Sequence, residues 1–367
     1  MGKLRIRGGK VWREDHFEMN KELVYETNEA DQIKELSEED LLTPGLIDFH
    51  VHLWSPATVS AFGVPGEQMY AQGITGGIDA GSFGINNWLQ ADRFWAYASK
   101  MEVKSFLSIL PDGLAVFPPL EAPRPEEIRT DHLIERIKRI KNERLLGIKV
   151  QLGWLKYKSE ETDRELLKRA RYIADATDTK LMVHMSGTCL SMEEMVSYFK
   201  EGDIITHIYS GFDNTILDEQ GKVSPAIKEA ADRGIWFDVG HAGKHFSWEV
   251  FKKAYSQGVK FQTLGGDITA FSWKNRESFK IYDMFHLLSG FLNAGVSEDA
   301  VFQALITNPA DYMKKEMKLT DQCLILKKKE MNTVLTDGLG AEQACTHEYL
   351  PELFLKNNKI IYNKEEV

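Results

Sequence analysis

The sequence has few cysteines, no long apolar run and no excess of basic residues. Three cysteines occur among the 367 residues, Cys189, Cys323 and Cys345. They are too sparse for a disulfide framework, so we expect a reducing, cytoplasmic environment. No run of uncharged apolar residues reaches the roughly 18 needed to cross a bilayer. Residues 1–10 also lack the apolar core of a secretory signal. We therefore expect neither a membrane protein nor a secreted one.

Charge argues against another class of partner. The chain has 55 acidic and 45 basic residues and a formal net charge of −10. Nucleic-acid binding normally requires a basic face that displaces counterions from phosphates, so we expect no nucleic-acid partner. The sequence is compatible with a small-molecule partner and with a homo-oligomer. The hydrophobic content of 43% is enough to bury a large core.

Short apolar runs alternate with amphipathic, Lys/Glu-rich segments over most of the chain. Eight such runs occur, near residues 46–52, 74–79, 103–110, 146–151, 180–184, 203–207, 235–239 and 259–265. Strands that alternate with helices indicate parallel βαβ units, and eight units are the number that closes a barrel. The sequence thus predicts an α/β fold with a TIM-like (β/α)8 barrel. A doubly wound open sheet is the alternative.

Strand-like chemistry is found at both ends of the chain. Leu4–Ile6 and Lys10–Trp12 flank Gly8-Gly9, which predicts a β-hairpin, and three apolar runs recur between residues 323 and 362. We expect a small composite β-sandwich domain built from 1–44 plus 318–367. The barrel would then occupy 45–317, with helical segments at 277–293 and 297–317 closing it.

Two histidines end the first barrel run, in His50-Val51-His52. Side chains at i and i+2 of a strand point to the same face, so the two imidazoles converge. Imidazole is a ligand for zinc and similar divalent metals, although a hydrogen-bonded pair of core histidines has the same spacing.

Lys149 lies inside the fourth run, Leu146 to Gln151. A lysine in a buried parallel strand is rare unless it is paired or functional. One interpretation is an ion pair in a polar barrel mouth. The other is a lysine carboxylated by carbon dioxide, whose carbamate oxygens bridge two metals and remove the repulsion between an ammonium group and two cations.

Further ligand-type residues end later runs: His184 the fifth, His207 the sixth and Asp267 the eighth. TIM barrels place their chemistry at the C-terminal ends of their strands. We therefore consider these residues together with His50, His52 and Lys149. Additional candidates near this mouth, for substrate binding, are Tyr209, His241, Lys244 and Arg276.

The segment from Thr43 to His52, TPGLIDFHVH, closely resembles the opening signature of the amidohydrolase superfamily, a Pro-Gly turn leading into Asp-x-His-x-His. The strand-four lysine, the strand-five and strand-six histidines and the strand-eight aspartate follow in the order of that family. Within it, the chain looks most like the amidohydrolase/deacetylase group related to dihydroorotases, on the segments Gly76 to Ser82 and Phe237 to His241. Trp54 stands where dihydroorotases carry a substrate-binding arginine, and Ile268-Thr269 replaces an expected Leu-His.

The resemblance implies a binuclear site that holds two divalent metal ions, zinc by preference. His50 and His52 would bind the more buried ion, His184 and His207 the other, and carboxylated Lys149 would bridge both. Asp267 would bind the buried ion and act as general base and then general acid for a hydroxide that bridges the pair. The implied function is hydrolysis of an amide or ester in a small acylated substrate, as in a deacetylase. The alternatives are a purine-type (adenine) deaminase and a metal-free, non-catalytic barrel.

Overall fold

The computed structural model describes residues 2–53, 55–56, 63–115, 124–153, 159–270 and 283–366. Its centre is a parallel sheet in which each strand pairs with the next along the chain. Its seven strands are β7 (Leu46–Val51), β8 (Ile74–Ala80), β9 (Glu102–Ser108), β10 (Leu145–Gln151), β11 (Lys180–His184), β12 (Ile204–Thr206) and β13 (Trp236–Asp238). The order matches the first seven predicted runs and confirms the TIM-like barrel.

The eighth run, residues 259–265, does not form a regular strand. This segment lies between β13 and β7 and makes one parallel bridge to each of them, Asp238 to Thr263 and Val51 to Ile268. The barrel is therefore nearly closed. In this segment, aspartate side chains accept hydrogen bonds from backbone amides that a neighbouring strand would accept in a regular sheet. The Gly265 amide donates to Asp238 Oδ1 (3.0 Å) and the Gly266 amide to Asp48 Oδ1 (2.9 Å).

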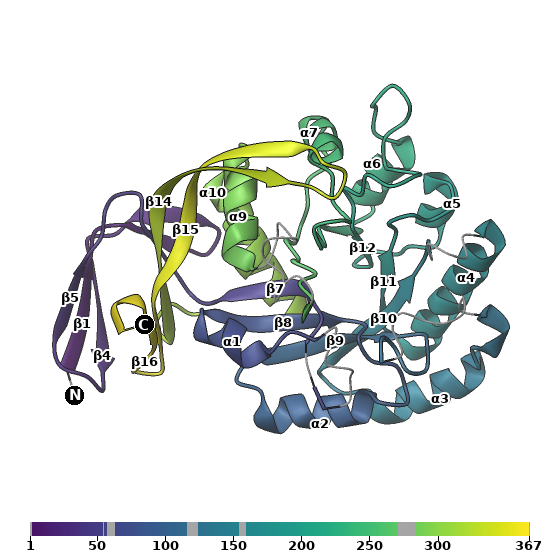
Figure 1. Ribbon diagram of the computed structural model, residues 1–367. Coiled ribbons are helices and arrows are strands. Elements are labelled where there is room, and N and C mark those ends of the chain that lie inside the picture. Colours follow the sequence, from purple (N-terminus) through teal and green to yellow (C-terminus); the bar gives the residue numbers. More distant parts are fainter. Residues whose placement is uncertain are drawn as a thin grey trace.

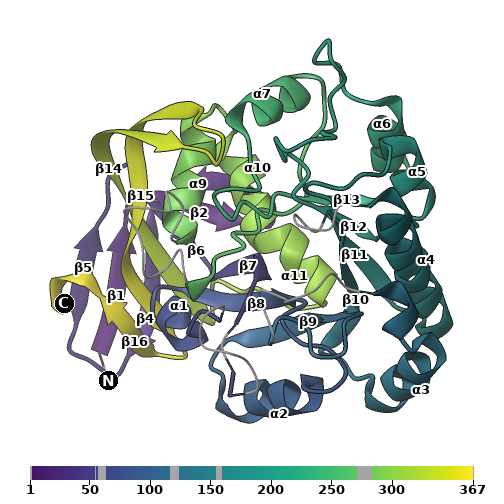
Figure 2. The same ribbon diagram turned by 45° about the vertical axis from the view of Figure 1, so that its right-hand side comes forward.

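Helices lie on the outer face of the parallel sheet (Figure 1, Figure 2). They are α1 (Gly66–Ala71), α2 (Trp88–Ala98), α3 (Thr130–Ile140), α4 (Glu160–Thr177), α5 (Met192–Ser197), α6 (Pro225–Asp232) and α7 (Trp248–Ser256). The start of α4 is capped by Ser159, whose side chain accepts a hydrogen bond from the Thr162 amide. After the barrel come α9 (Met284–Asn293), α10 (Glu298–Phe302) and α11 (Asn308–Met313), the last two joined by a π-helical turn, Gln303–Thr307.

Strands from both ends of the chain build the rest of the molecule, beside the barrel (Figure 1). A six-stranded sheet has the order β16-β15-β14-β6-β2-β3, and a three-stranded sheet has the order β4-β1-β5. Their bounds are β1 (Gly2–Arg7), β2 (Lys10–Arg13), β3 (His16–Met19), β4 (Glu22–Thr27), β5 (Gln32–Glu35), β6 (Leu41–Thr43), β14 (Gln322–Thr336), β15 (Glu342–Lys356) and β16 (Lys359–Asn363). A separate apolar cluster that includes Leu4, Ile6, Val11 and Ile325 packs both sheets together as a sandwich.

The predicted hairpin around Gly8-Gly9 is wrong. β1 pairs with β4 and β5, whereas β2 pairs with β3 and β6 in the other sheet. Both glycines adopt left-handed φ angles, 76° and 74°, and a Cβ on Gly8 would lie 2.4 Å from the Leu36 carbonyl oxygen. The glycine pair therefore passes the chain from one sheet to the other instead of turning it back on itself.

The antiparallel pair β14–β15 forms a long hairpin that crosses over α9 towards α7 (Figure 1). At its tip, Asp337 Oδ2 accepts a hydrogen bond from the Trp248 amide at 2.8 Å. The Leu339 side chain lies beside Gly211, where a Cβ would meet it at 2.4 Å. The hairpin thus joins the small sheets to the loops that follow β12 and β13.

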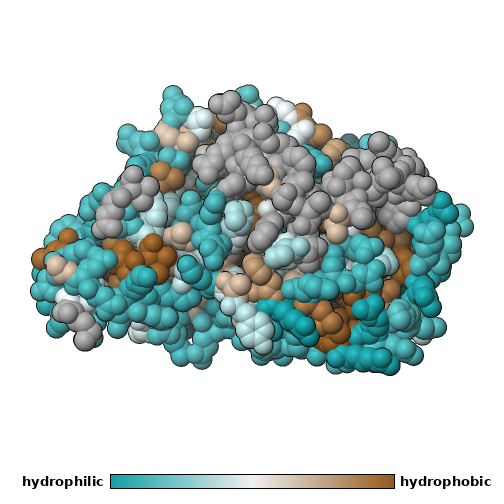
Figure 3. Space-filling view, turned by 60° about the horizontal axis from the view of Figure 1, so that its bottom comes forward, coloured by the Kyte–Doolittle hydropathy of each residue, from teal (hydrophilic) through white to brown (hydrophobic). Residues whose placement is uncertain are grey.

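The described surface seen in Figure 3 is mostly hydrophilic, with separate hydrophobic areas. The large hydrophobic side chains that are exposed lie on different elements, such as Met19 on β3, Ile33 on β5 and Tyr97 on α2. Within the described ranges, no helix has both the length and the apolar character to cross a membrane.

Candidate metal centre

The first two candidate ligands come from the end of β7, where the register against β8 shifts between Asp48 and Val51. The His50 and His52 rings lie 5.7 Å apart. His50 Nδ1 lies 2.8 Å from Thr206 Oγ1 and 3.1 Å from Asp238 Oδ2. His52 Nδ1 lies 2.8 Å from Ser82 Oγ. Both rings are therefore held by Nδ1, the arrangement that leaves Nε2 available for a metal.

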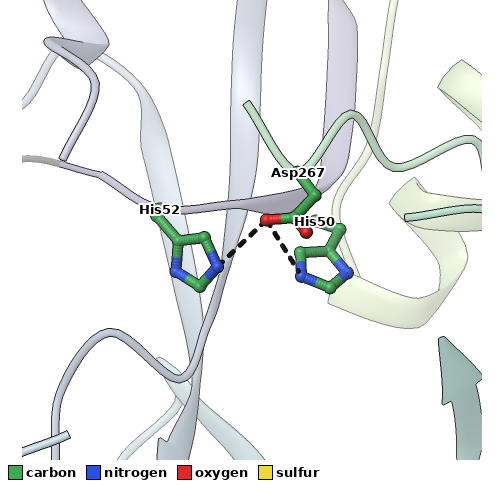
Figure 4. A group of neighbouring side chains, drawn as sticks. All are labelled: His50, His52 and Asp267. Atoms are coloured by element: carbon green, nitrogen blue, oxygen red, sulfur yellow. Dashed lines mark ion pairs between the residues drawn. The ribbon is translucent and has the colours of Figure 1, made fainter. Parts of the chain in front are cut away.

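Asp267 meets these two imidazoles from the segment that stands in for the eighth strand (Figure 4). Its Oδ1 lies 3.1 Å from His52 Nε2 and 3.6 Å from His50 Nε2. One ligand atom from each of these three buried residues lies within 4.8 Å of the other two. Burial opposes ionisation of Asp267, but the two neighbouring histidines outweigh it and lower the pKa of the carboxyl. Ionised, it can bind a cation.

Backbone geometry sets the direction of that carboxylate. Asp267 adopts a left-handed φ of 49°, and its amide donates to the His50 carbonyl at 2.6 Å. Such a conformation is uncommon for a residue other than glycine, although aspartate tolerates it better than most, and the surrounding structure must hold it in place.

Lys149 lies within β10 and is buried, with its Nζ lacking any hydrogen-bond partner among the described residues. Burial lowers the pKa of its amine to about 8, although Asp267 acts in the opposite direction. More of the amine is therefore uncharged near neutrality than in an exposed lysine, and the uncharged amine is the form that adds carbon dioxide. Gly81, at a φ of 94°, leaves room for the lysine stem, because a Cβ there would lie 2.6 Å from Lys149 Cγ.

His184 at the end of β11 and His207 after β12 form a second imidazole pair, with ring centroids 4.1 Å apart. His207 Nδ1 donates to the Gly240 carbonyl at 2.6 Å, while its Nε2 is buried without a partner in the described structure and lies 4.0 Å from Asp267 Oδ2. Burial lowers the pKa of both histidines well below the usual value. Both are therefore neutral at pH 7, which is the metal-binding form.

The donor set fits metal ions. Four imidazoles, an ionised carboxylate and a lysine amine surround the same buried space, and Lys149 Nζ and His207 Nε2 are buried polar atoms with no partner among the described residues. Buried polar atoms without partners cost free energy unless a ligand satisfies them.

Two buried aspartates support this arrangement, and their roles were not predicted from the sequence. Asp48 Oδ1 accepts from the amides of His50 (3.1 Å) and Gly266 (2.9 Å), which ties β7 to the segment that carries Asp267. Asp238 Oδ2 accepts from Thr206 and Oδ1 from Thr263. Asp48 belongs to the Asp-x-His-x-His motif, and that motif is the signal that could have revealed its role.

The candidates for substrate binding are arranged differently. Tyr209 is not brought to the site, because its ring is buried among aromatic side chains and its hydroxyl donates to the Val259 carbonyl at 2.9 Å. His241 is buried against Phe246, with ring centroids 4.2 Å apart. Lys244 is exposed on the loop between β13 and α7. Arg276 lies outside the described residues.

His245 is a residue that sequence reasoning missed. Its ring lies 4.8 Å from that of His184 and 4.7 Å from that of His207. It occupies an irregular loop, so no periodicity identifies it. The sequence offers one signal for it. His245 lies four residues beyond His241, in the loop that follows a strand ending at the barrel mouth.

Comparison with known proteins agrees with this geometry. No family model matches the chain. A deacetylase of Brucella anthropi is 26% identical over 278 residues, which cover 76% of this chain and 67% of that protein. A deacetylase of Agrobacterium fabrum is 25% identical, covering 76% of this chain and 66% of the relative. The chain thus spans about two thirds of the length of these two relatives.

Solved structures share the fold over almost the full chain. A dihydroorotase superposes with a TM-score of 0.77 and an adenine deaminase with 0.79; each is 21% identical, and each match covers 98% of this chain. The chain is therefore similar in fold to this dihydroorotase and this adenine deaminase, and similar in sequence to the two deacetylases. The ligand-type residues of this chain lie at the C-terminal ends of its barrel strands, the position predicted from the sequence.

Proposed function

We propose that this protein is an amidohydrolase, a metal-dependent hydrolase that removes an acyl group from a small amide or ester. One observation carries the proposal: buried ligand-type side chains from β7, β10, β11, the end of β12 and the segment before Ile268 converge at one end of the barrel. The deacetylase relatives favour an acyl substrate.

The six residues divide into two sets around a shared bridge. His50, His52 and Asp267 would hold one divalent ion, His184 and His207 would hold a second, and carboxylated Lys149 would supply an oxygen to each. When bound, the two ions, zinc by preference, would polarise the scissile carbonyl and lower the pKa of a water molecule towards neutrality. The protein's contribution is to fix the ligands through their second nitrogens, as it does for His50, His52 and His207.

Asp267 would carry the proton. Its carboxylate is ionised and lies among the ligands, so Oδ2 can accept the proton of the attacking water and then deliver it to the leaving nitrogen or oxygen. Its left-handed backbone and the hydrogen bond from its amide to His50 hold it in place during both transfers.

We propose further that the substrate carries a carboxylate. Lys244 is an exposed cation on the loop after β13, and Arg276 follows Asp267 in the sequence. Lys244 would pair with a carboxylate of the substrate, and Arg276, which lies outside the described residues, has the planar guanidinium that offers a carboxylate two parallel hydrogen bonds. We place the reaction in the cytoplasm, with a small molecule as the partner.

Adenine deamination is the second candidate. The superposition on an adenine deaminase favours it, because ring amidines and acyl carbonyls both present an sp² carbon to the attacking water.

Metal analysis and a substrate panel test these alternatives. Protein purified without chelator is expected to contain about two divalent ions per chain, and to release acetate from N-acetyl amino acids or acetylated 2-hydroxy acids. Rapid ammonia release from adenine without acyl hydrolysis would favour the deaminase. Full activity in the presence of chelator, with no bound metal, would exclude the metal-dependent mechanism.

A further inference from the structure

His245 occupies a place beside the second imidazole pair that none of the six proposed ligands fills. It lies in the loop between β13 and α7, and its ring is within 4.8 Å of the rings of His184 and His207, measured between centroids. Those two neighbours are buried, whereas His245 is partly exposed. This imidazole is therefore open to a molecule that enters the barrel mouth.

A pair of hydroxyl groups fixes the orientation of the ring. His245 Nδ1 lies 2.9 Å from Ser186 Oγ, and Ser186 Oγ lies 2.8 Å from Ser210 Oγ. Both serines are buried, one in the loop after β11 and one in the loop after β12. A chain of donors in which Ser210 donates to Ser186 and Ser186 donates to Nδ1 satisfies all three groups. It leaves the proton of the imidazole on Nε2.

The position of His245 differs from that of a preformed metal ligand. Over the ranges that the structure describes, His50, His52 and Asp267 are the one group whose three ligand atoms lie within 4.8 Å of one another. His184, His207 and His245 do not bring their nitrogens together in that way, although their rings are close. A free Nε2–H beside the ligands, rather than among them, is suited to a substrate atom.

We propose that His245 is a further catalytic residue, whose Nε2–H donates a hydrogen bond to the acyl carbonyl oxygen of the substrate. The inference rests on the proposed function, in which His184 and His207 hold the metal ion on the open side of the site. The carbonyl oxygen gains negative charge when water attacks the carbon, so a donor fixed in advance stabilises the transition state more than the bound substrate. Ser186 and Ser210 position the donor and do not contact the substrate.

Two substitutions distinguish the contribution of Nε2 to activity from that of Nδ1. His245→Gln places an amide N–H near the position of Nε2, whereas His245→Asn keeps a polar group near Nδ1 and loses the donor. With N-acetylglycine as substrate, His245→Asn is expected to lower kcat about 100-fold with little change in KM, the usual loss for one such donor. His245→Gln should recover at least a tenth of wild-type kcat. His132→Asn, the same change on the exposed surface of α3, is the matched control.

Metal content supplies a readout that does not depend on turnover. Both His245 variants are expected to hold as many ions per chain as the wild type. A loss of one ion in both would make His245 a ligand and would overturn the inference. Equal kcat in the Asn and Gln variants would also overturn it, because the effect would then come from the contact with Ser186.

A binding measurement distinguishes this inference from the proposed function. The dissociation constant of acetohydroxamate, a non-hydrolysed acyl probe, is measured by calorimetric titration of the holoenzyme. His245→Asn should weaken binding about tenfold, and His245→Gln much less. If the wild type hydrolyses no acyl compound but this pattern holds, the proposed reaction fails and the His245 contact stands. An unchanged dissociation constant in His245→Asn rejects the contact.

Discussion

Lys149 is the residue whose environment departs most from that of an ordinary lysine, since its amine is buried without a hydrogen-bond partner in the described structure. Lys149→Ala is expected to lose bound metal and activity, because no other side chain would bridge the two ligand sets. Excess acetate or propionate should restore part of both by supplying the missing anion. Metal content and turnover are measured with and without the added acid.

The control for this experiment is Lys180→Ala, at the exposed start of β11. It removes a lysine from a barrel strand without touching the site and should leave metal content unchanged. Full metal content and turnover in Lys149→Ala, without added acid, would refute the bridging role.

Asp267 is the proposed proton carrier, and its amide analogue keeps the shape while losing the charge. Asp267→Asn is expected to leave the fold intact and to lower kcat by at least about 100-fold, the scale of losing an acid-base residue. Steady-state kinetics on metal-replete protein provide the measurement. A well-folded Asp267→Asn with two ions per chain and near-normal kcat would remove Asp267 from the proton path.

Much of the residue-level site could be predicted, because a ligand at the end of a barrel strand follows a recognisable apolar run. His50, His52 and Asp267 do come together, and His184 pairs with His207. Tyr209 is not brought to the site, because a side chain three residues past the end of β12 can turn into the core as easily as towards the mouth. His245 escaped prediction because its loop has no periodicity.

At the scale of elements, the tip of the β14–β15 hairpin is tied to the first residue of α7, where the loop from β13 ends. Asp337 Oδ1 accepts from the Leu339 and Ala341 amides, both at 2.9 Å, and Oδ2 accepts from the Trp248 amide. Asp337→Ala leaves three amides without this acceptor and is expected to cost about 2 to 3 kcal/mol in the free energy of unfolding. Denaturant titration measures it, and amide exchange at Trp248 should accelerate.

Asp337→Asn is the matched control, since it retains one acceptor oxygen, and it should be less destabilised. Equal stability of Asp337→Ala and the wild type would show that the tip does not hold the loop.

A contact between α4 and α5 gives a pH-dependent contribution to stability. Arg164 donates to Glu194 through Nε (2.5 Å) and Nη2 (2.9 Å), and these hydrogen bonds lower the pKa of Glu194. A carboxyl group whose pKa is lower in the folded state stabilises the fold above its unfolded pKa. This contribution is lost as the pH falls through the folded pKa.

Glu194→Gln is therefore expected to lower the free energy of unfolding by up to about 1 kcal/mol at pH 7, given that both side chains are partly exposed. The difference should shrink as the pH falls through the lowered folded pKa of Glu194 and vanish once this carboxyl is protonated in both the folded and the unfolded state. Thermal unfolding over this range measures it. Glu160→Gln, at a more exposed partner of Arg164, should have a smaller effect, and a difference that grows on acidification would contradict the assignment.

The order of strands and helices followed from the sequence, but two local features did not. The glycine pair at residues 8 and 9 joins two sheets because strands further along the chain, β4 and β6, provide better partners for β1 and β2. The eighth run lacks a regular strand because aspartate side chains accept its amides. Both outcomes depend on contacts distant in sequence, which a local pattern does not contain.

At the scale of the whole molecule, metal binding and stability should be linked. The proposed ligands are buried, and two of their polar atoms have no partner among the described residues, so ions that bind only the folded state stabilise it. Removal of the metals by a chelator is expected to lower Tm by several degrees, and added zinc should restore it. Differential scanning calorimetry provides the measurement. An identical Tm with and without chelator would contradict the linkage.

The hairpin that reaches from the small sheets to α7 also orders events in time. On the ribosome, every proposed metal ligand and His245 are synthesised before residues 337–341. This hairpin tip contains Asp337, whose carboxylate accepts a hydrogen bond from the Trp248 amide. A nascent chain that has emerged only as far as α11 therefore holds the complete ligand set, while the loop with His241 and His245 still lacks its packing partner. Domains form as the chain emerges. We therefore expect the proposed metal ligands and the loop proposed to face the substrate to reach their final packing at different moments of translation.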